Sequence, residues 1–154
     1  MNPLLRWLLR APAWLYRARC GWMLGHRFLL LVHTGRNTGL RRETVLEVMA
    51  YRRAASEFVV MSGFGRNAQW LRNLAATRNP EVWTSRRRFI ASYRMLPPGE
   101  AESVLQAYET RHRLAAPVIR AVLSRLLGWR YDGSGAARQR AVEQLPLVGF
   151  RPRS

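Results

Sequence analysis

Two apolar runs flank a glycine-containing turn in residues 28–49, which read FLLLVHTGRNTGLRRETVLEVM. The runs have the composition of buried strands, and their connection is short enough for an antiparallel hairpin. Gly35 and Gly39 can reach positive φ without steric cost, so the turn can expose backbone N–H groups. Arginine adds bidentate recognition of phosphate or carboxylate. Thr34–Arg42 therefore predicts a hairpin turn that holds an anion, with solvated arginines in an ordinary hairpin as the alternative.

Short strand patterns recur along the rest of the chain and predict a small antiparallel barrel with flanking helices, an α+β fold. The strand patterns lie at residues 26–34, 43–51, 57–61, 81–85, 88–96 and 145–150. Pro146 favours an edge position for the last strand. Helices are predicted at residues 3–25, 67–77, 100–127 and 136–144, with Asn67 as an N-cap and a break near Pro117. We predict one domain over residues 1–154: an N-terminal amphipathic helical segment (1–26), a barrel core (27–96), a helical segment (97–144) and a final strand (145–152).

The chain is strongly basic, with a formal net charge of +17 over 154 residues and arginine as its basic residue throughout. Such a charge favours anionic partners: nucleic acid, acidic lipid or an anionic small molecule. Cys20 is the single cysteine, which excludes an intrachain disulfide and favours a reducing compartment. We therefore predict a cytoplasmic protein, with the inner face of the cell membrane as an alternative location.

The segment 3–25 predicts an amphipathic helix with arginines on one side and leucines on the other. We favour packing of its apolar side on the domain's own core. The alternative is peripheral membrane contact, because a basic helix with tryptophans can lie in a membrane interface.

The side chains offer little acid–base chemistry of their own. His26, His33 and His112 have no companions at metal-ligand spacing, and neither a catalytic triad nor a carboxylate pair is evident. If the protein is an enzyme, a cofactor is expected to supply the reactive group.

A second glycine-containing loop, Ser62–Arg66, precedes the predicted helix 67–77. Trp70 and Asn73 lie three residues apart in that helix, so both can face the same neighbour. We predict that Thr34–Arg42 and Ser62–Asn73 flank one mouth of the barrel. The alternative is that Trp70 is simply a core residue.

These residues together resemble the deazaflavin-dependent nitroreductase family. The family pattern T-G-R-x-S/T-G-x-x-R matches Thr34–Arg42, and Asn67, Trp70, Asn73 and Leu74 resemble its N-P-x-W-x-x-N-L helix. Asn79–Val82 resembles the strand entry that follows, and residues 145–152 resemble the family's terminal strand. The resemblance implies a split β-barrel of the FMN-binding type and binding of coenzyme F-420, an 8-hydroxy-5-deazaflavin with a phosphodiester and an oligoglutamate tail. FMN is the alternative cofactor.

Carried onto this sequence, the resemblance implies which residues bind the cofactor. Those expected at the phosphate and tail are Arg36, Asn37, Thr38, Gly39, Arg41 and Arg42. Those expected at the deazaflavin ring are Met61, Ser62 and Gly63, with Trp70 and Asn73 approaching from the helix.

Three positions depart from the family pattern. Asn37 stands where a lysine often follows T-G-R, and Asn67-Ala68 replaces Asn-Pro. The family's nitroreductases have a C-terminal cluster of tyrosines near the substrate, and here only Tyr131 is close to that region. Tyr131 is therefore the candidate proton donor.

We therefore predict an oxidoreductase that transfers a hydride from reduced coenzyme F-420 to a small-molecule acceptor: an enone, quinone or nitro compound. A homodimer is a further prediction, and no specific nucleic-acid partner is expected. The alternative is a non-enzymatic basic protein that binds nucleic acid or an anionic membrane surface.

Overall fold

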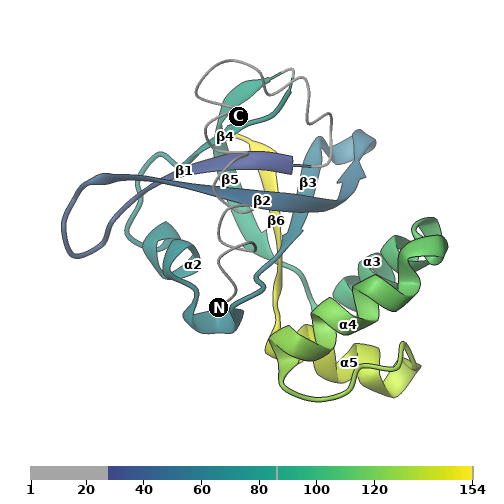
Figure 1. Ribbon diagram of the computed structural model, residues 1–154. Coiled ribbons are helices and arrows are strands. Elements are labelled where there is room, and N and C mark those ends of the chain that lie inside the picture. Colours follow the sequence, from purple (N-terminus) through teal and green to yellow (C-terminus); the bar gives the residue numbers. More distant parts are fainter. Residues whose placement is uncertain (1–27, 86, 154) are drawn as a thin grey trace.

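A closed antiparallel barrel forms the centre of the protein (Figure 1). The computed structural model describes residues 28–85 and 87–153, so the predicted helix 3–25 and Cys20 lie outside the described residues. The strands are β1 (Phe28–Thr34), β2 (Arg41–Arg52), β3 (Glu57–Met61), β4 (Glu81–Trp83), β5 (Arg88–Met95) and β6 (Leu147–Pro152). The helices are α2 (Gln69–Leu74), α3 (Pro98–Arg111), α4 (Ala116–Leu127) and α5 (Gly135–Gln144), with short 3-10 turns η2 (Arg53–Ala55), η3 (Gly65–Asn67) and η4 (Arg113–Ala115).

The strands are hydrogen-bonded in the order β1-β2-β3-β6-β5-β4, and β4 closes the ring by pairing with β1. The predicted α+β class, an antiparallel barrel with flanking helices, is thus confirmed for the described part of the chain. In that part, no helix is both long enough and apolar enough to cross a membrane.

Strand β1 is buried on both faces, which explains its unbroken apolar sequence. Leu29 and Leu31 belong to the core inside the barrel. Leu30 and Val32 point the other way and pack with Trp83. Because side chains alternate along a strand, a run of leucine and valine is suited to a strand covered from both sides.

The predicted edge position of the last strand is wrong. β6 lies between β3 and β5 and pairs with both of them. Pro146 precedes the strand instead of lying within it, so its missing N–H leaves no gap in the ladder. Its carbonyl oxygen accepts a hydrogen bond from the N–H of Ser62, 2.9 Å away.

A buried carboxylate ties the barrel to the helices. Glu57 in β3 is fully buried, and Arg94 Nε and Arg151 Nε donate to its Oε2 over 2.8 and 3.0 Å. Arg94 also donates to Glu100 near the start of α3, with 2.6 Å between Nη2 and Oε1. Gly149 makes room for Glu57, because a Cβ at that position would lie 2.5 Å from Glu57 Oε2.

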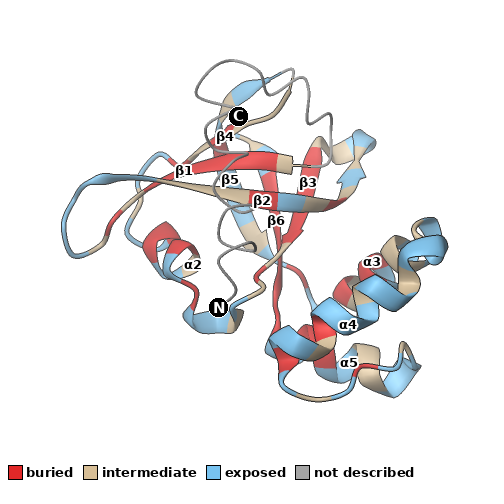
Figure 2. Ribbon diagram, in the orientation of Figure 1, coloured by how far each residue is buried: buried red, intermediate tan, exposed pale blue. Residues whose placement is uncertain are grey.

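A second core holds α3, α4 and α5 together at one side of the barrel (Figure 1). Leu105, Leu123 and Val142 are buried from the three helices, and Leu147 joins them from the barrel. The helices carry their buried residues toward one another and their exposed residues outward (Figure 2).

The break in the predicted helix 100–127 falls before Pro117, not at it. α3 ends at Arg111, η4 follows, and Pro117 is in the first turn of α4, where a missing N–H costs nothing. Gly128, with φ of 81°, ends α4 as predicted.

The helix predicted at 67–77 is shorter than expected. α2 spans Gln69–Leu74, and Asn67 lies in η3 before it. The N-cap position is Ala68, which makes no side-chain capping hydrogen bond. Asn67 is therefore not the cap that its residue type suggested.

Candidate functional site

A cavity of about 330 Å³ lies where the turn between β1 and β2 meets helix α2. The turn contributes Gly35 to Thr38, β2 contributes Arg42, and α2 contributes Trp70 and Asn73. Of the two segments predicted at one mouth of the barrel, Thr34–Arg42 and Ser62–Asn73, this cavity joins the first to the helical end of the second, whereas Ser62 and Gly63 do not line it.

The turn has its shape because of its two glycines. Gly35 N donates to Leu40 O and Gly39 N donates to Gly35 O, both over 2.8 Å. Gly39 has φ of 70°, which a residue with a Cβ rarely adopts. A Cβ on Gly35 would lie 2.7 Å from Thr38 Oγ1. The turn thus presents Arg36, Asn37 and Thr38 on its outer rim.

Asn73 attaches the turn to helix α2. Its side chain is buried, and its Oδ1 accepts from the Arg36 backbone N–H at 3.2 Å and from Arg36 Nη1 at 2.9 Å. Arg36 Nη1 also donates to Gln69 Oε1 at 2.9 Å. Four residues after Asn73, Thr77 Oγ1 accepts a hydrogen bond from Thr34 N at 3.0 Å. The Arg36 guanidinium is therefore held in a fixed position at the cavity.

His33 forms the buried floor beneath this attachment. Asn73 Nδ2 lies 3.1 Å from His33 Nδ1, and Thr44 Oγ1 lies 3.0 Å from His33 Nε2. Burial, together with the nearby Arg42 charge, lowers the pKa of His33 to about 4, so the ring is neutral at pH 7. Because the Asn73 amide donates to Nδ1, the ring hydrogen is on Nε2 and is donated to Thr44. The prediction of a structural rather than metal-ligating histidine agrees with this, and the described residues contain no cluster suited to a metal ion.

Arg42 supplies a cation that is not committed to another side chain. Its guanidinium makes no hydrogen bond or ion pair with the residues that the structure describes, and it lines the cavity beside His33. Arg41, its neighbour, is on the other face of β2. Its guanidinium lies 5.6 Å from the Trp83 ring centroid and 3.2 Å from Glu43 Oε1.

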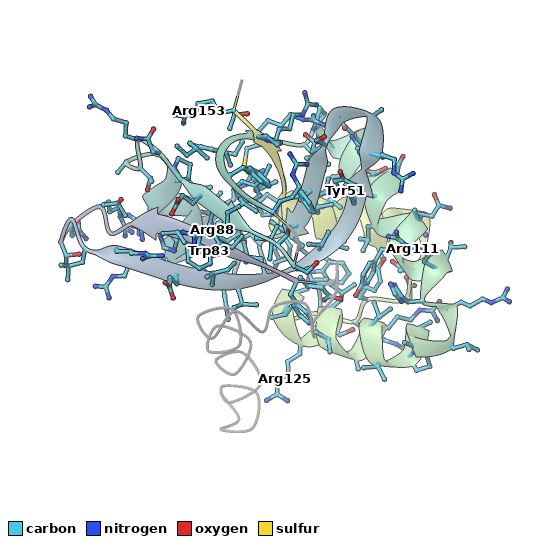
Figure 3. The ribbon with its side chains drawn as sticks, turned by 90° about the horizontal axis from the view of Figure 1, so that it is seen from above. Tyr51, Trp83, Arg88, Arg111, Arg125 and Arg153 are labelled. Carbon is cyan, nitrogen blue, oxygen red and sulfur yellow. The ribbon has the colours of Figure 1, made fainter. Side chains whose placement is uncertain are left out.

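Trp83 is thus covered by two arginines, since the Arg88 guanidinium lies 3.7 Å from its ring centroid (Figure 3). Arg41 and Gly39 line neither cavity. Of the residues predicted at the phosphate and tail, the structure brings Arg36, Asn37, Thr38 and Arg42 to the first cavity.

A second cavity, of about 390 Å³, lies between the barrel and the helices α3 and α4. Met61 and Gly63 line it from the end of β3, as expected for residues beside a ring. Ser62 between them does not, because it is fully buried and its hydroxyl donates to Gly65 O at 2.6 Å. The backbone of Ser62 is engaged as well, because its N–H donates to Pro146 O and its carbonyl oxygen accepts from Gly65 N.

One corner of this mainly apolar cavity is polar. Tyr108 Oη donates to Glu47 Oε1 over 2.5 Å, and the His112 ring centroid lies 4.7 Å from that of Tyr108. None of Tyr108, Glu47 and His112 was predicted as a site residue. The spacing of four between Tyr108 and His112 in a predicted helix was the available signal, since it places both on one face.

Tyr131, the predicted proton donor, lies elsewhere. It is buried among the helices, and its hydroxyl donates to Glu109. Burial raises the pKa of Tyr131 well above its usual value, and the residue lines neither cavity. Among the described tyrosines, Tyr108 is the one that lines either cavity.

Comparison with known proteins agrees with an anion-binding barrel that holds a deazaflavin. A family model described as F420H(2)-dependent quinone reductase matches residues 8–113. The chain belongs to this family, which makes it an oxidoreductase with coenzyme F-420 as its cofactor. The deazaflavin dependence expected from the resemblance is confirmed, and the non-enzymatic alternative is wrong. None of the curated proteins matches the chain at a significant level.

Solved structures of similar shape differ greatly in sequence. An F420-H2 Dependent Reductase (FDR-A) is 14% identical, with 81% of this chain and 94% of that chain covered and a TM-score of 0.48. A protein of unknown function from Agrobacterium tumefaciens is 11% identical, with 84% and 49% covered and a TM-score of 0.52. A structure described as a domain-swapped dimer is 15% identical, with 91% and 99% covered and a TM-score of 0.48. At such identity, the likeness to the Agrobacterium protein supports the fold alone.

The first cavity fits the polyanionic part of coenzyme F-420. Arg36 is held in place and Arg42 is uncommitted, so two guanidinium groups are available to phosphate or carboxylate oxygens. Asn37 lines the same cavity, so the charge that a lysine would bring at position 37 is absent.

Proposed function

We propose that the protein reduces a flat, apolar acceptor such as a quinone, with the cofactor's phosphate and tail at the first cavity and its ring beside the second. The observation that carries this proposal is the pairing of the two cavities. One is rimmed by Arg36 and Arg42, and the other is lined mainly by aliphatic side chains from α3 and α4. Reduced coenzyme F-420 supplies a hydride, and a quinone that accepts it needs one proton to become the quinol.

The second cavity supports an apolar acceptor because of its walls. Leu105, Ile119 and Leu123 line it from the helices, and Met61 lines it from the barrel. Desolvating an apolar ring against such side chains is favourable, at roughly 25 cal/mol per Å² of apolar surface. Enones and aromatic nitro compounds share this shape, so the same cavity suits the wider acceptor class.

The polar corner gives the acceptor oxygen a hydrogen-bond partner. Tyr108 Oη is within hydrogen-bond distance of Glu47 and next to His112, so it can donate to an acceptor oxygen after turning from Glu47. A positioned donor of this kind assists proton delivery as hydride arrives. We propose Tyr108 in this role in place of Tyr131.

Titration with oxidised and reduced coenzyme F-420 tests the cofactor assignment. We expect saturable binding of one cofactor per chain, seen by absorbance and fluorescence, and weaker binding of FMN. Arg42→Ala is expected to weaken binding by about tenfold, because a charge-assisted hydrogen bond contributes roughly 1.5–3 kcal/mol when well formed and Arg42 is exposed.

Arg153→Ala is the matched control, because Arg153 is also exposed but donates to Asn79 and Arg78 away from both cavities. Equal affinities of Arg42→Ala and Arg153→Ala would remove Arg42 from the cofactor site. Binding that is not saturable, or that disappears at physiological salt, would contradict a specific cofactor site.

Tyr108→Phe tests the acceptor side. We expect a fall of about tenfold to one-hundredfold in kcat with a soluble quinone, since one positioned acid is typically worth that much or more. The dissociation constant of coenzyme F-420 is expected to be unchanged.

Tyr51→Phe is the control for loss of a tyrosine hydroxyl, because Tyr51 is 42% exposed and packs on Phe58 instead of at the cavity. A kcat for Tyr108→Phe equal to that of Tyr51→Phe would exclude the proposed donor.

A further inference from the structure

Helix α4 carries an exposed apolar stripe. The stripe is Leu114 in η4 followed by Val118, Val122 and Leu126 in α4, exposed by 96%, 64%, 52% and 36%. A spacing of four residues places these side chains along one face of a helix. The opposite face, with Leu123 and Leu127, is buried in the helical core. α4 thus carries apolar residues on its inner side and also on part of its outer side.

The charged residues of η4 and α4 themselves have one sign. Arg113, Arg120 and Arg125 are exposed, and no aspartate or glutamate occurs between Glu109 and Asp132. Arg125 projects outward from α4, away from the barrel (Figure 3). Exposed leucine and valine among arginines, without acidic residues, is the composition of a helix that lies in an anionic membrane interface.

The stripe is continuous with the second cavity. Val118, Val122 and Leu126 line that cavity and also contribute to the exposed stripe. A surface that contacts the stripe would therefore contact the cavity rim. This continuity favours a lipid surface, because a molecule dissolved in lipid could enter the cavity without crossing water.

We propose that α4 and η4 form a docking surface for an anionic lipid membrane. Leu114, Val118 and Val122 enter the acyl boundary, and Arg113 and Arg125 contact lipid phosphates. The proposal does not depend on the identity of the cofactor or the acceptor, and it concerns residues other than the N-terminal segment 3–25.

Site-specific fluorescence on the full chain tests this surface. Cys20→Ser provides a cysteine-free background. Val118→Cys then carries an environment-sensitive dye at the stripe, and Ile90→Cys carries it at a control position. Ile90 is 44% exposed and lies in β5 opposite Glu81 of β4. With phosphatidylglycerol vesicles we expect a blue shift at position 118 and none at position 90, and no shift at either with phosphatidylcholine vesicles.

Charge reversal gives the second measurement. Arg113→Glu combined with Arg125→Glu is expected to weaken sedimentation with phosphatidylglycerol vesicles by at least about tenfold at low salt, since each arginine contributes about fivefold near an anionic surface. Arg153→Glu is the single-site control for the loss of positive charge, and is expected to bind nearly as well as the parent chain.

Several outcomes would overturn the proposal. Vesicle binding without a shift at position 118 would assign the contact to another segment, such as residues 3–25. A shift at position 118 that grows with protein concentration in the absence of vesicles would identify a second copy of the chain as the occupant. Equal shifts with phosphatidylcholine and phosphatidylglycerol would exclude a role for the arginines.

Discussion

Replacing Asn73 by leucine is expected to weaken coenzyme F-420 binding by about fivefold to one-hundredfold. The Asn73 side chain connects His33 on the floor of the first cavity to the backbone and guanidinium of Arg36. Leucine has a similar size but cannot make these hydrogen bonds, which leaves a buried histidine nitrogen without its donor. An unsatisfied buried group costs roughly 1–3 kcal/mol, and the released turn no longer presents Arg36 in a fixed position.

The affinity is measured by titration, and thermal unfolding followed by circular dichroism shows how much of the change is a loss of stability. Asn79→Leu is the matched control. Asn79 is exposed and also accepts from an arginine, with 2.8 Å between its Oδ1 and Arg153 Nη1. If Asn73→Leu binds the cofactor as tightly as Asn79→Leu does, Arg36 does not need to be positioned by α2. If Asn73→Leu does not fold, Arg36→Gln tests the same guanidinium without disturbing the buried amide.

Replacing Glu57 by glutamine is expected to lower the free energy of unfolding by about 2–4 kcal/mol at pH 7. Glu57 is fully buried and accepts hydrogen bonds from Arg94 and Arg151. Removing one partner of a buried ion pair typically costs about 3–5 kcal/mol, and the arginines here are partly exposed, which reduces the cost. Denaturant unfolding measures the change, with Glu143→Gln on the exposed face of α5 as control.

The same cluster predicts how stability depends on pH. The bonds from Arg94 and Arg151 lower the pKa of Glu57 below its usual 4.5, and those from Arg94 and Arg52 lower the pKa of Glu100 to about 2. A carboxylate whose pKa is lower in the folded state stabilises the fold above the unfolded-state pKa, and this contribution is lost as the pH falls through the folded-state pKa. The difference in stability between the parent chain and Glu57→Gln should therefore shrink as the pH falls below about 4.5, the usual pKa of a glutamate. A difference that stays constant over that range would show that the carboxylate charge is not what stabilises the barrel.

The barrel strands could be predicted because their signals are local. Each one is a short run of β-branched, aromatic or aliphatic residues between turn residues, and β3 was predicted with both of its ends, Glu57 and Met61. The position of β6 between β3 and β5 could not be read from Pro146, because both neighbours lie far away in sequence. The end of α3 likewise depended on packing rather than on Pro117.

The first cavity was largely predictable and the second was not. The glycines and arginines of Thr34–Arg42 act within one turn, so their chemistry is visible in the sequence. The family resemblance assigned both Arg41 and Arg42 to the site, and the sequence does not show where β2 begins. Because β2 begins at Arg41, neighbouring arginines point to opposite faces, and only Arg42 lines the cavity. The Tyr108 and Glu47 pair joins α3 to β2 across 61 positions, and no local pattern reveals such a contact.

The position of β6 in the barrel has a consequence for how the protein is made. β3 and β5 are neighbours of β6 and not of each other, and Phe58 pairs with Phe150 although β4, β5 and four α-helices separate them in sequence. While the ribosome is still translating the helical segment, the facing edges of β3 and β5 have no partner. Unpaired strand edges and exposed apolar surface favour aggregation, and long-range pairing is slow. Closure of the barrel therefore waits for residues 147–152, and the nascent chain is the form of this protein that most needs protection by chaperones.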